Sequence, residues 1–228
     1  MNDNNSNFAV AIDGPGGAGK STAAKGAAKK LGMVYIDTGA MYRAVALYSI
    51  KEGANTNDIN AISRLLPEID IEIIISDAGQ RVLLNGADVT EELRTQEIAE
   101  GASVVSQYMP IREKLTAMQR QIADKNRVIM DGRDIGSVVL PNAQVKIFMD
   151  ASFDVRVDRR IKELLLKGQQ CDRETIKNEM ATRDARDASR DAAPMIQASD
   201  AVYLDTSLMS EDEAVESVLK IINQKIYN

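Results

Sequence analysis

The sequence of 228 residues contains no histidine, no tryptophan and a single cysteine, Cys171. Without histidine, the chain lacks the base of Ser-His-Asp and Cys-His catalysis and the commonest zinc ligand. One cysteine excludes an internal disulfide and a zinc site built from several thiolates. Chemistry must therefore come from lysine, arginine and aspartate side chains, from backbone N–H groups, and from a metal that a ligand brings.

Long apolar runs and excess positive charge are also missing. No stretch approaches the about 18 apolar residues of a membrane-spanning helix, and residues 1–7 are polar, so we expect neither a membrane partner nor a signal peptide. The formal net charge of −6 argues against a nucleic-acid polymer as partner, and any anion site must be built locally. The lone cysteine predicts a reducing, cytoplasmic location.

A glycine-rich loop, GPGGAGKST at residues 14–22, fits the pattern G-x-x-x-x-G-K-[ST]. Its glycines let the backbone approach phosphate oxygens, and successive N–H groups point at the anion. Lys20 reaches the β and γ phosphates, and Ser21 is the expected ligand of Mg²⁺. We therefore predict that the loop binds ATP through nine residues: Gly14, Pro15, Gly16, Gly17, Ala18, Gly19, Lys20, Ser21 and Thr22.

Short apolar runs predict five parallel strands, at residues 8–13, 33–36, 127–130, 145–149 and 201–204. Helical segments follow at about residues 20–31, 39–52 and 211–226, so the chain begins as a βαβ unit. The fold class is therefore α/β, a three-layer P-loop fold with a five-stranded parallel sheet. Residues 67–91 break the rhythm: two strand patterns and the tight turn Asn85-Gly86 predict a small antiparallel insertion, a flap on the substrate side and not core.

A second anion site is predicted at residues 37–43, where Thr38 is the expected N-cap of a helix and Arg43 adds positive charge. Asp131 ends another strand beside the phosphate loop and is suited to hold Mg²⁺ or its waters, with Arg133 over the same cleft. A capped helix with a surface arginine and a plain strand-ending turn remain the alternatives at these two places.

Two clusters of arginines lie further along the chain. If residues 174–191 form one helix, Arg183, Arg186 and Arg190 lie within an arc of about 60° beside a row of aspartates. Arg156, Arg159 and Arg160 form the second cluster, which suits a lid over a transferring phosphoryl group. For residues 174–191, a solvated helix with charge pairs is the alternative. Arg112 lies off the apolar stripe of its helix, and its alternative is a solvated side chain.

These motifs together resemble the bacterial cytidylate kinase family of nucleoside monophosphate kinases. The resemblance covers almost the whole chain and rests on GPGGAGKST, DTGAMYR, EELRTQEIAEGAS, DGRD, VKIFMDAS and RDARDASRDAAP. It implies transfer of the ATP γ-phosphoryl group to CMP or dCMP with Mg²⁺, by a monomer. It also implies one domain, residues 1–228, with a core at 8–66, 105–150 and 200–228, a monophosphate-binding insertion at 67–104, and a helical lid with flanking arginine helices at 155–190.

The resemblance further implies roles for individual residues. Thr38, Arg43 and Arg133 match positions that hold the acceptor phosphate; Ser103, Arg112 and Asp134 match those that read cytosine. Asp187 matches a ribose contact, and Arg183 and Arg190 match arginines near the phosphate and nucleoside. The expected CMP site also includes Asp131 and Gly132, and the expected catalytic set is Lys20, Arg133, Arg159, Arg160 and Arg183. Serine also occurs in the family where this chain has Thr38, and the hydroxyl is kept.

Two other functions stay open on the sequence. A nucleotide-gated switch would bind and slowly hydrolyse its nucleotide without an acceptor. A small-metabolite kinase of the shikimate or gluconate type would have no nucleoside site. The preference between CMP and dCMP is not fixed by these residues.

Overall fold

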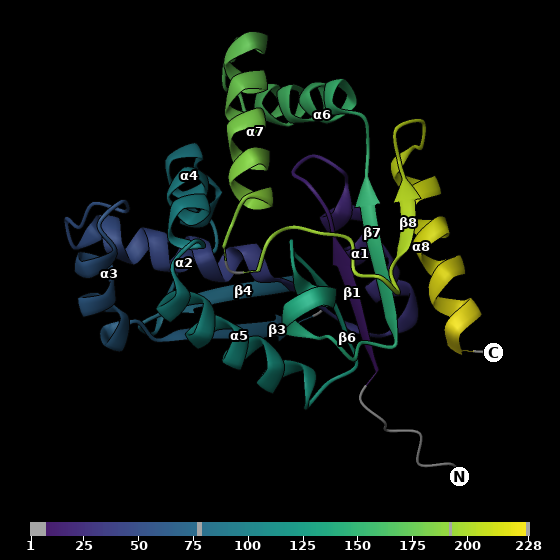
Figure 1. The fold of residues 1–228 in the computed structure, drawn as a ribbon, viewed down its shortest axis with the longest axis horizontal. Coiled ribbons are helices and arrows are strands. Elements are labelled where there is room, and N and C mark those ends of the chain that lie inside the picture. Colours follow the sequence, from purple (N-terminus) through teal and green to yellow (C-terminus); the bar gives the residue numbers. More distant parts are fainter. Residues whose placement is uncertain (1–7, 77–78, 192, 227–228) are drawn as a thin grey trace.

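A five-stranded parallel sheet forms the centre of the computed structural model, which describes residues 8–76, 79–191 and 193–226 (Figure 1). The prediction for residues 1–7 lies outside the described residues. The strand order is β2-β6-β1-β7-β8. The five strands are β1 (Ala9–Asp13), β2 (Val34–Asp37), β6 (Val128–Asp131), β7 (Val145–Asp150) and β8 (Val202–Asp205), which confirms the predicted set.

Alternate side chains of each strand face opposite layers. Val10 and Ile12 of β1 pack in one buried cluster with α1 (Lys20–Leu31) and α8 (Glu211–Ile226). Ala11, between them, packs with the π-helical turn η3 (Ile135–Val139) and the end of α5 (Met109–Ala123) on the other face. Both faces of the sheet are thus covered, as the runs of apolar residues predict.

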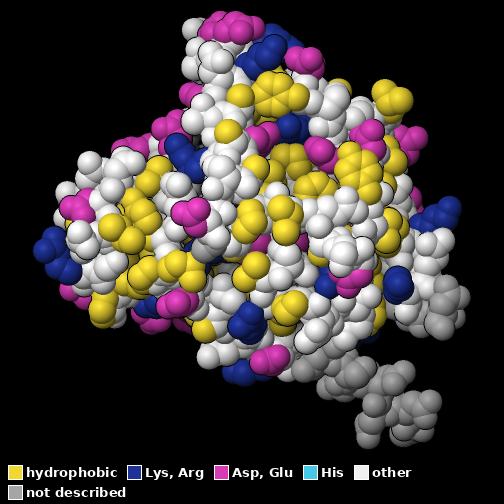
Figure 2. All heavy atoms as spheres, in the orientation of Figure 1, with side chains coloured by type: hydrophobic (Ala, Val, Ile, Leu, Met, Phe, Trp, Pro, Cys, Tyr) yellow, Lys and Arg dark blue, Asp and Glu magenta, His cyan; other side chains and the backbone are white. Residues whose placement is uncertain are grey.

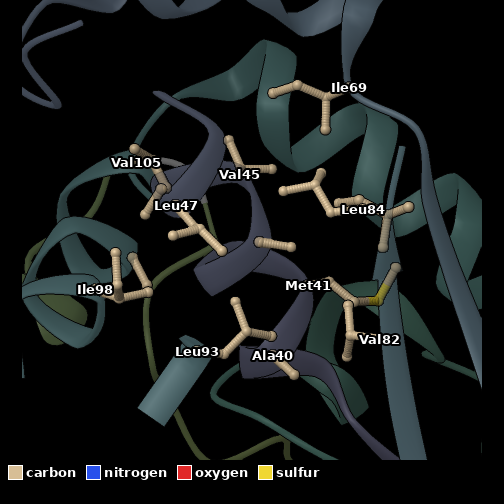
Figure 3. Close-up of a cluster of buried hydrophobic side chains, with 14 of the residues drawn as sticks. Ala40, Met41, Val45, Leu47, Ile69, Val82, Leu84, Leu93, Ile98 and Val105 are labelled. Carbon is tan, nitrogen blue, oxygen red and sulfur yellow. The ribbon is translucent and has the colours of Figure 1, made fainter. Parts of the chain in front are cut away.

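The insertion forms its own three-stranded antiparallel sheet from β3 (Ile71–Ser76), β4 (Gly79–Leu84) and β5 (Ala87–Asp88). It lies between α2 (Thr38–Lys51), α3 (Ile59–Leu65) and η1 (Leu66–Glu68) on one side in sequence, and η2 (Glu92–Arg94) and α4 (Gln96–Val105) on the other. The insertion is separate from the parallel sheet, as predicted, but the prediction that it is not core is wrong. Val82 and Leu84 are buried in a second hydrophobic cluster with Met41, Val45 and Ile98 (Figure 3).

Two helices, α6 (Phe153–Leu166) and α7 (Arg173–Ala188), stand above the carboxyl ends of the strands (Figure 1). They pack on each other through Val157, Leu164 and Ile176. The prediction of one helix through residue 191 is wrong, because α7 ends at Ala188. Pro194 stands beyond this end, where proline is common because it cannot continue a helix.

Candidate active site

A cleft of about 1070 Å³ is lined by the glycine-rich loop and by residues of α4, α6 and α7. Its lining includes eleven lysines and arginines but only seven aspartates and glutamates. The whole chain carries a net charge of −6, so positive charge is concentrated in this one place. A cleft of this sign and size suits anionic ligands.

The phosphate loop forms the floor of the cleft. Gly14 has φ 141°, and a Cβ at this position would lie 1.9 Å from the backbone oxygen of Met149, so only glycine fits. The Nζ of Lys20 donates to the backbone oxygen of Pro15 at 2.7 Å. Burial, followed by the nearby Arg133, lowers the pKa of Lys20 to about 7. A bound polyphosphate would favour the protonated amine and restore its charge.

Asp131 connects the loop to the sheet. Its Oδ2 accepts from the Ser21 hydroxyl and its Oδ1 from the Tyr35 hydroxyl, each at 2.8 Å. Burial and then Asp37 raise the pKa of Asp131. Adjacent hydroxyl and carboxylate oxygens are suited to Mg²⁺ or its waters. Within residues 8–76, 79–191 and 193–226, no group of three or more acidic, cysteine or histidine side chains could hold a metal by itself. The site therefore fits a cation whose remaining ligands come from a nucleotide.

The turn after β2 differs from the prediction in its cap. Asp37, not Thr38, is the N-cap of α2, and its Oδ1 accepts from the backbone N–H of Ala40 at 3.1 Å. The other carboxylate oxygen pairs with Arg43 at 2.6 Å. The Asp37 carboxylate can therefore accept from the N–H group and from the guanidinium at once. The Thr38 hydroxyl does not cap the helix and donates instead to the backbone oxygen of Asp131 at 2.8 Å. Thr38 and Arg43 nevertheless line the cleft, as predicted.

Arg112 and Asp134 form a buried ion pair at the α4 side of the cleft. Arg112 is 4% exposed, and it also donates to the backbone oxygen of Ser106 at 3.0 Å. The solvated alternative for Arg112 is therefore wrong. Burial raises the pKa of Asp134, although Arg112 opposes the change. Ser103 of α4 is buried nearby in the cleft lining, and its hydroxyl accepts from Arg186 at 2.9 Å.

Asp187 is a buried carboxylate that pairs with two arginines of the cleft. It is 1% exposed and pairs with Arg133 at 2.9 Å and with Arg190. Burial acts to raise the pKa of Asp187, but Arg133, Arg190 and Arg183 together hold it below its usual value. The structure thus rules out the solvated alternative for the end of α7. Arg190 lies beyond the helix, yet it reaches the cleft and donates to the Ser106 hydroxyl at 2.9 Å.

The side chain of Arg183 lines the cleft and carries charge that a bound anion would neutralise. Burial and then Arg133 lower the pKa of Arg183 to about 10. Its Nε is buried and has no hydrogen-bond partner among the described atoms. Because a buried N–H group without a hydrogen-bond partner is costly, this position favours a bound phosphate.

The three arginines of α6 have different surroundings. Arg159 and Arg160 line the cleft, Arg159 donating to the backbone oxygen of Thr206 at 2.6 Å. Arg156 is buried instead, where it donates to the backbone oxygen of Gly16 at 3.1 Å and pairs with Asp184 at 2.6 Å. It supports the phosphate loop from behind.

Comparison with known proteins identifies the family. A sequence model of the family described as cytidylate kinase matches residues 10–224. A Leuconostoc mesenteroides protein named cytidylate kinase is 49% identical over 96% of this chain and 98% of its own length. One from Bacillus subtilis is 44% identical over 96% of this chain and 97% of its own. The chain belongs to the cytidylate kinase family.

Membership of the cytidylate kinase family confirms the resemblance of the sequence motifs and the kinase activity that it implied. A crystal structure of an uncharacterized protein from Eubacterium ventriosum has a TM-score of 0.51 and 14% identity, covering 95% of this chain and 98% of that one. At this identity the likeness concerns the fold alone.

This member of the cytidylate kinase family has site residues that the sequence did not single out. Asp13 is 5% exposed, and its carboxylate accepts from the N–H groups of Ile135 and Gly136, each at 2.7 Å. Gln80 of β4 accepts from the N–H of Asp37 at 2.8 Å and donates to its backbone oxygen at 3.3 Å. Their partners are distant in sequence, so neither local pattern carried a signal, although Asp13 directly precedes the glycine-rich loop.

Proposed function

We propose that this chain transfers the γ-phosphoryl group of ATP to CMP or dCMP. The observation that carries the proposal is the joining of three features in one cleft: a phosphate loop, a second anion site, and a buried ion pair able to read a base. The second anion site consists of Arg43, Arg133 and Arg183. A nucleotide switch needs neither of the last two features, and a small-metabolite kinase needs no base site.

Cytosine matches the polar groups on the α4 side of the cleft. It offers an amino donor at N4 and acceptors at N3 and O2. Asp134 and Ser103 can accept from N4, while Arg112 can donate to N3 and O2. Uracil has a donor at N3 and an acceptor at the 4-position, the reverse of cytosine, which would leave buried groups unpaired.

We assign the acceptor phosphate to Thr38, Arg43 and Arg133, with Arg183 beside it. Asp187 is suited to accept from the ribose, and Arg190 contributes near the nucleoside. The ATP phosphates lie along residues 14–22, where the N-terminus of α1 points its N–H groups at the anion. We place Asp131 and Gly132 on the acceptor side as well. Position 132 lies close to Thr38, since a Cβ there would be 2.9 Å from the Thr38 hydroxyl oxygen.

The mechanism is in-line transfer in which this chain binds, orients and neutralises charge. Lys20, whose protonated form is favoured by the bound polyphosphate, holds the β and γ oxygens. Arg133 and Arg183 from the acceptor side, with Arg159 and Arg160 from the lid, stabilise charge on the transferred group. Mg²⁺, held by Ser21 and by Asp131 or its waters, would supply further charge neutralisation when bound with ATP. The acceptor phosphate is already anionic, so a strong general base is not required.

We further propose the division of labour that the sequence implies. Residues 67–104 serve as the monophosphate-binding insertion and residues 155–190 as a lid that excludes water from the transfer. We propose that the protein acts as a monomer in the cytoplasm. Along the described parts of the chain, 8–76, 79–191 and 193–226, the helices are too short or too polar to cross a membrane.

The test is to supply Mg·ATP with CMP, dCMP, UMP, AMP or shikimate in separate reactions and to follow ADP release. We expect fast release with CMP and dCMP and little release with the other acceptors or with water. Equal release in all reactions would mean an ATPase or a switch and would contradict the proposal. Release that responds only to shikimate would favour a small-metabolite kinase.

A further inference from the structure

Gln96 is the first residue of α4, a helix that lies beside α7 (Figure 1). Its Oε1 accepts from the guanidinium of Arg160 on α6, and its Nε2 donates to the carboxylate of Glu179 on α7 at 2.9 Å. One side chain therefore joins three helices, two of them in the lid. The Thr95 hydroxyl caps α4 by accepting from the N–H of Ile98 at 3.3 Å, so the backbone that carries Gln96 is fixed.

The partners of Gln96 require an amide. Its donor end faces Glu179 and, at 3.4 Å, Glu100, whereas its acceptor end faces a guanidinium. A carboxylate at position 96 would meet two other carboxylates, and a lysine would meet Arg160. Only an amide presents an acceptor and a donor in these two directions.

Arg160 is held from two sides by this arrangement. Gln96 binds one end of its guanidinium and Glu163 of the same helix binds the other at 2.9 Å. Arg160 also lines the cleft. Long arginine side chains lose conformational entropy when they are fixed, so a partner that fixes them beforehand lowers the cost of their use in transfer.

We propose that Gln96 is a positioning residue that clasps the lid to α4 and holds Arg160 over the cleft. The inference rests on the proposed function, because it assigns Arg160 to the transferring phosphoryl group. Gln96 itself touches no reacting atom. Its loss should therefore reduce turnover more than it reduces the binding of either substrate.

The first test compares Gln96→Ala with Gln107→Ala. Gln107 is an exposed glutamine just beyond the other end of α4, and its amide bonds only within its own turn among the described residues, to the backbone oxygen of Val104. In steady-state assays with Mg·ATP and CMP, we expect Gln96→Ala to lower kcat about tenfold. The KM values for CMP and ATP should stay within about twofold, and ADP release without acceptor should become a larger fraction of turnover. Gln107→Ala should leave all of these unchanged.

The second test exchanges the amide of Gln96 and the carboxylate of Glu179 between the two positions. Gln96→Glu keeps the acceptor for Arg160 but repels Glu179, so we expect kcat to fall at least as far as in Gln96→Ala. Glu179→Gln alone should keep an amide pair and near-normal turnover. In the double variant Gln96→Glu with Glu179→Gln, the new amide donates to the new carboxylate while Glu100 still faces it, so kcat should rise well above that of Gln96→Glu.

The two hypotheses fail in different ways. If the unaltered protein shows no CMP-dependent ADP release, the proposed function fails. If it is active and Gln96→Ala behaves as Gln107→Ala does, or if the double variant is no better than Gln96→Glu, the clasp is overturned and the proposed function stands. Parallel thermal unfolding of all variants separates loss of folded protein from loss of positioning.

Discussion

Asp13 lies at the end of β1, directly before the phosphate loop, and holds the first two N–H groups of η3. Through these bonds it connects the loop to the segment that carries Arg133 and Asp134. Burial raises the pKa of Asp13 to about 6, although the bonds from Gly136 and Ile135 oppose the change. The carboxyl group therefore keeps its proton in the folded state at a pH where the unfolded chain has lost it.

This shift predicts how stability depends on pH. The folded pKa is above the ordinary aspartate value of 3.8, so the contribution of Asp13 is fully present below pH 4 and is lost as pH rises towards 6. A shift of this size corresponds to about 3 kcal/mol. The amide introduced by Asp13→Asn does not titrate, and its single oxygen accepts in place of the two carboxylate oxygens.

Urea unfolding of both proteins between pH 4 and pH 7 measures the effect. The free energy of unfolding of the unaltered protein should fall relative to that of Asp13→Asn across this range and then level off. Carboxyl groups that do not interact with Asp13 titrate alike in both proteins, so they cancel in the difference. Parallel curves would show that the folded state does not shift the pKa of Asp13.

Asp134 is the residue at which the choice of base is decided. In Asp134→Asn, the charged acceptor for N4 is lost and an amide that can also donate takes its place. We expect kcat/KM with CMP to fall by about 10- to 100-fold, the range for a hydrogen bond to a charged group. The kcat/KM with UMP should fall less, so the preference for CMP over UMP becomes smaller.

The assay for Asp134→Asn is ADP release with CMP and with UMP, with Asp191→Asn as the matched control because Asp191 is exposed. Equal losses with the two acceptors would mean that Asp134 only supports Arg112. Thermal unfolding is needed alongside, since Arg112 is left buried without its charge partner.

At the level of helices and strands, the patterns that the sequence could reveal are those with local causes. Apolar runs predicted the places of the five strands, and the spacing of Gly14, Gly19 and Lys20 predicted the phosphate loop. The choice between Asp37 and Thr38 as cap was not visible, because both are good caps and only the position of Arg43 favours the carboxylate.

The remaining features depend on partners brought together by the fold. Arg112 lies off the apolar stripe of α5 and reads as solvated until Asp134, 22 positions away, is placed beside it. Gln80 and Gln96 are ordinary polar residues in sequence, and their partners lie 43 and 64 to 83 positions away. Long-range pairs of this kind leave no periodicity, so a single sequence does not predict them.

Gln80 connects the two sheets at the edge of the parallel one. β2 is the outer strand, and the amide of Gln80 pairs with both backbone groups of Asp37 as a neighbouring strand would. In Gln80→Ala, this support for the turn at residues 37–43 is lost. With each hydrogen bond worth about 1 kcal/mol, we expect the KM for CMP to rise about fivefold or more.

The test of this role for Gln80 is whether the KM for CMP changes more than the KM for ATP. The KM for ATP should stay within about twofold, because the phosphate loop is held by other contacts. Gln121→Ala, on the exposed side of α5, serves as control. Equal increases in the KM values for ATP and CMP would show a general loosening of the fold instead of a local effect on the turn at residues 37–43.

On the scale of the whole molecule, the charge is distributed unevenly. Figure 2 shows basic side chains as separate spots among acidic ones on one outer face. In the cleft, by contrast, eleven basic residues meet seven acidic ones. Arg133 and Arg190 share the single carboxylate of Asp187, and the Nε of Arg183 has no partner among the described atoms. The cleft therefore holds positive charge that its own acidic residues do not neutralise.

An uncompensated positive cleft predicts that salt weakens phosphate binding in particular. Raising the ionic strength from about 0.01 M to about 0.1 M shortens the screening length from about 30 Å to about 10 Å. The Kd of CMP, measured by calorimetry, should rise several-fold over this range. Cytidine has the same base and ribose contacts but no phosphate, so its Kd should change by less than about twofold. If the two ligands respond equally, the arginines are neutralised within the protein and the cleft does not concentrate its charge on the acceptor phosphate.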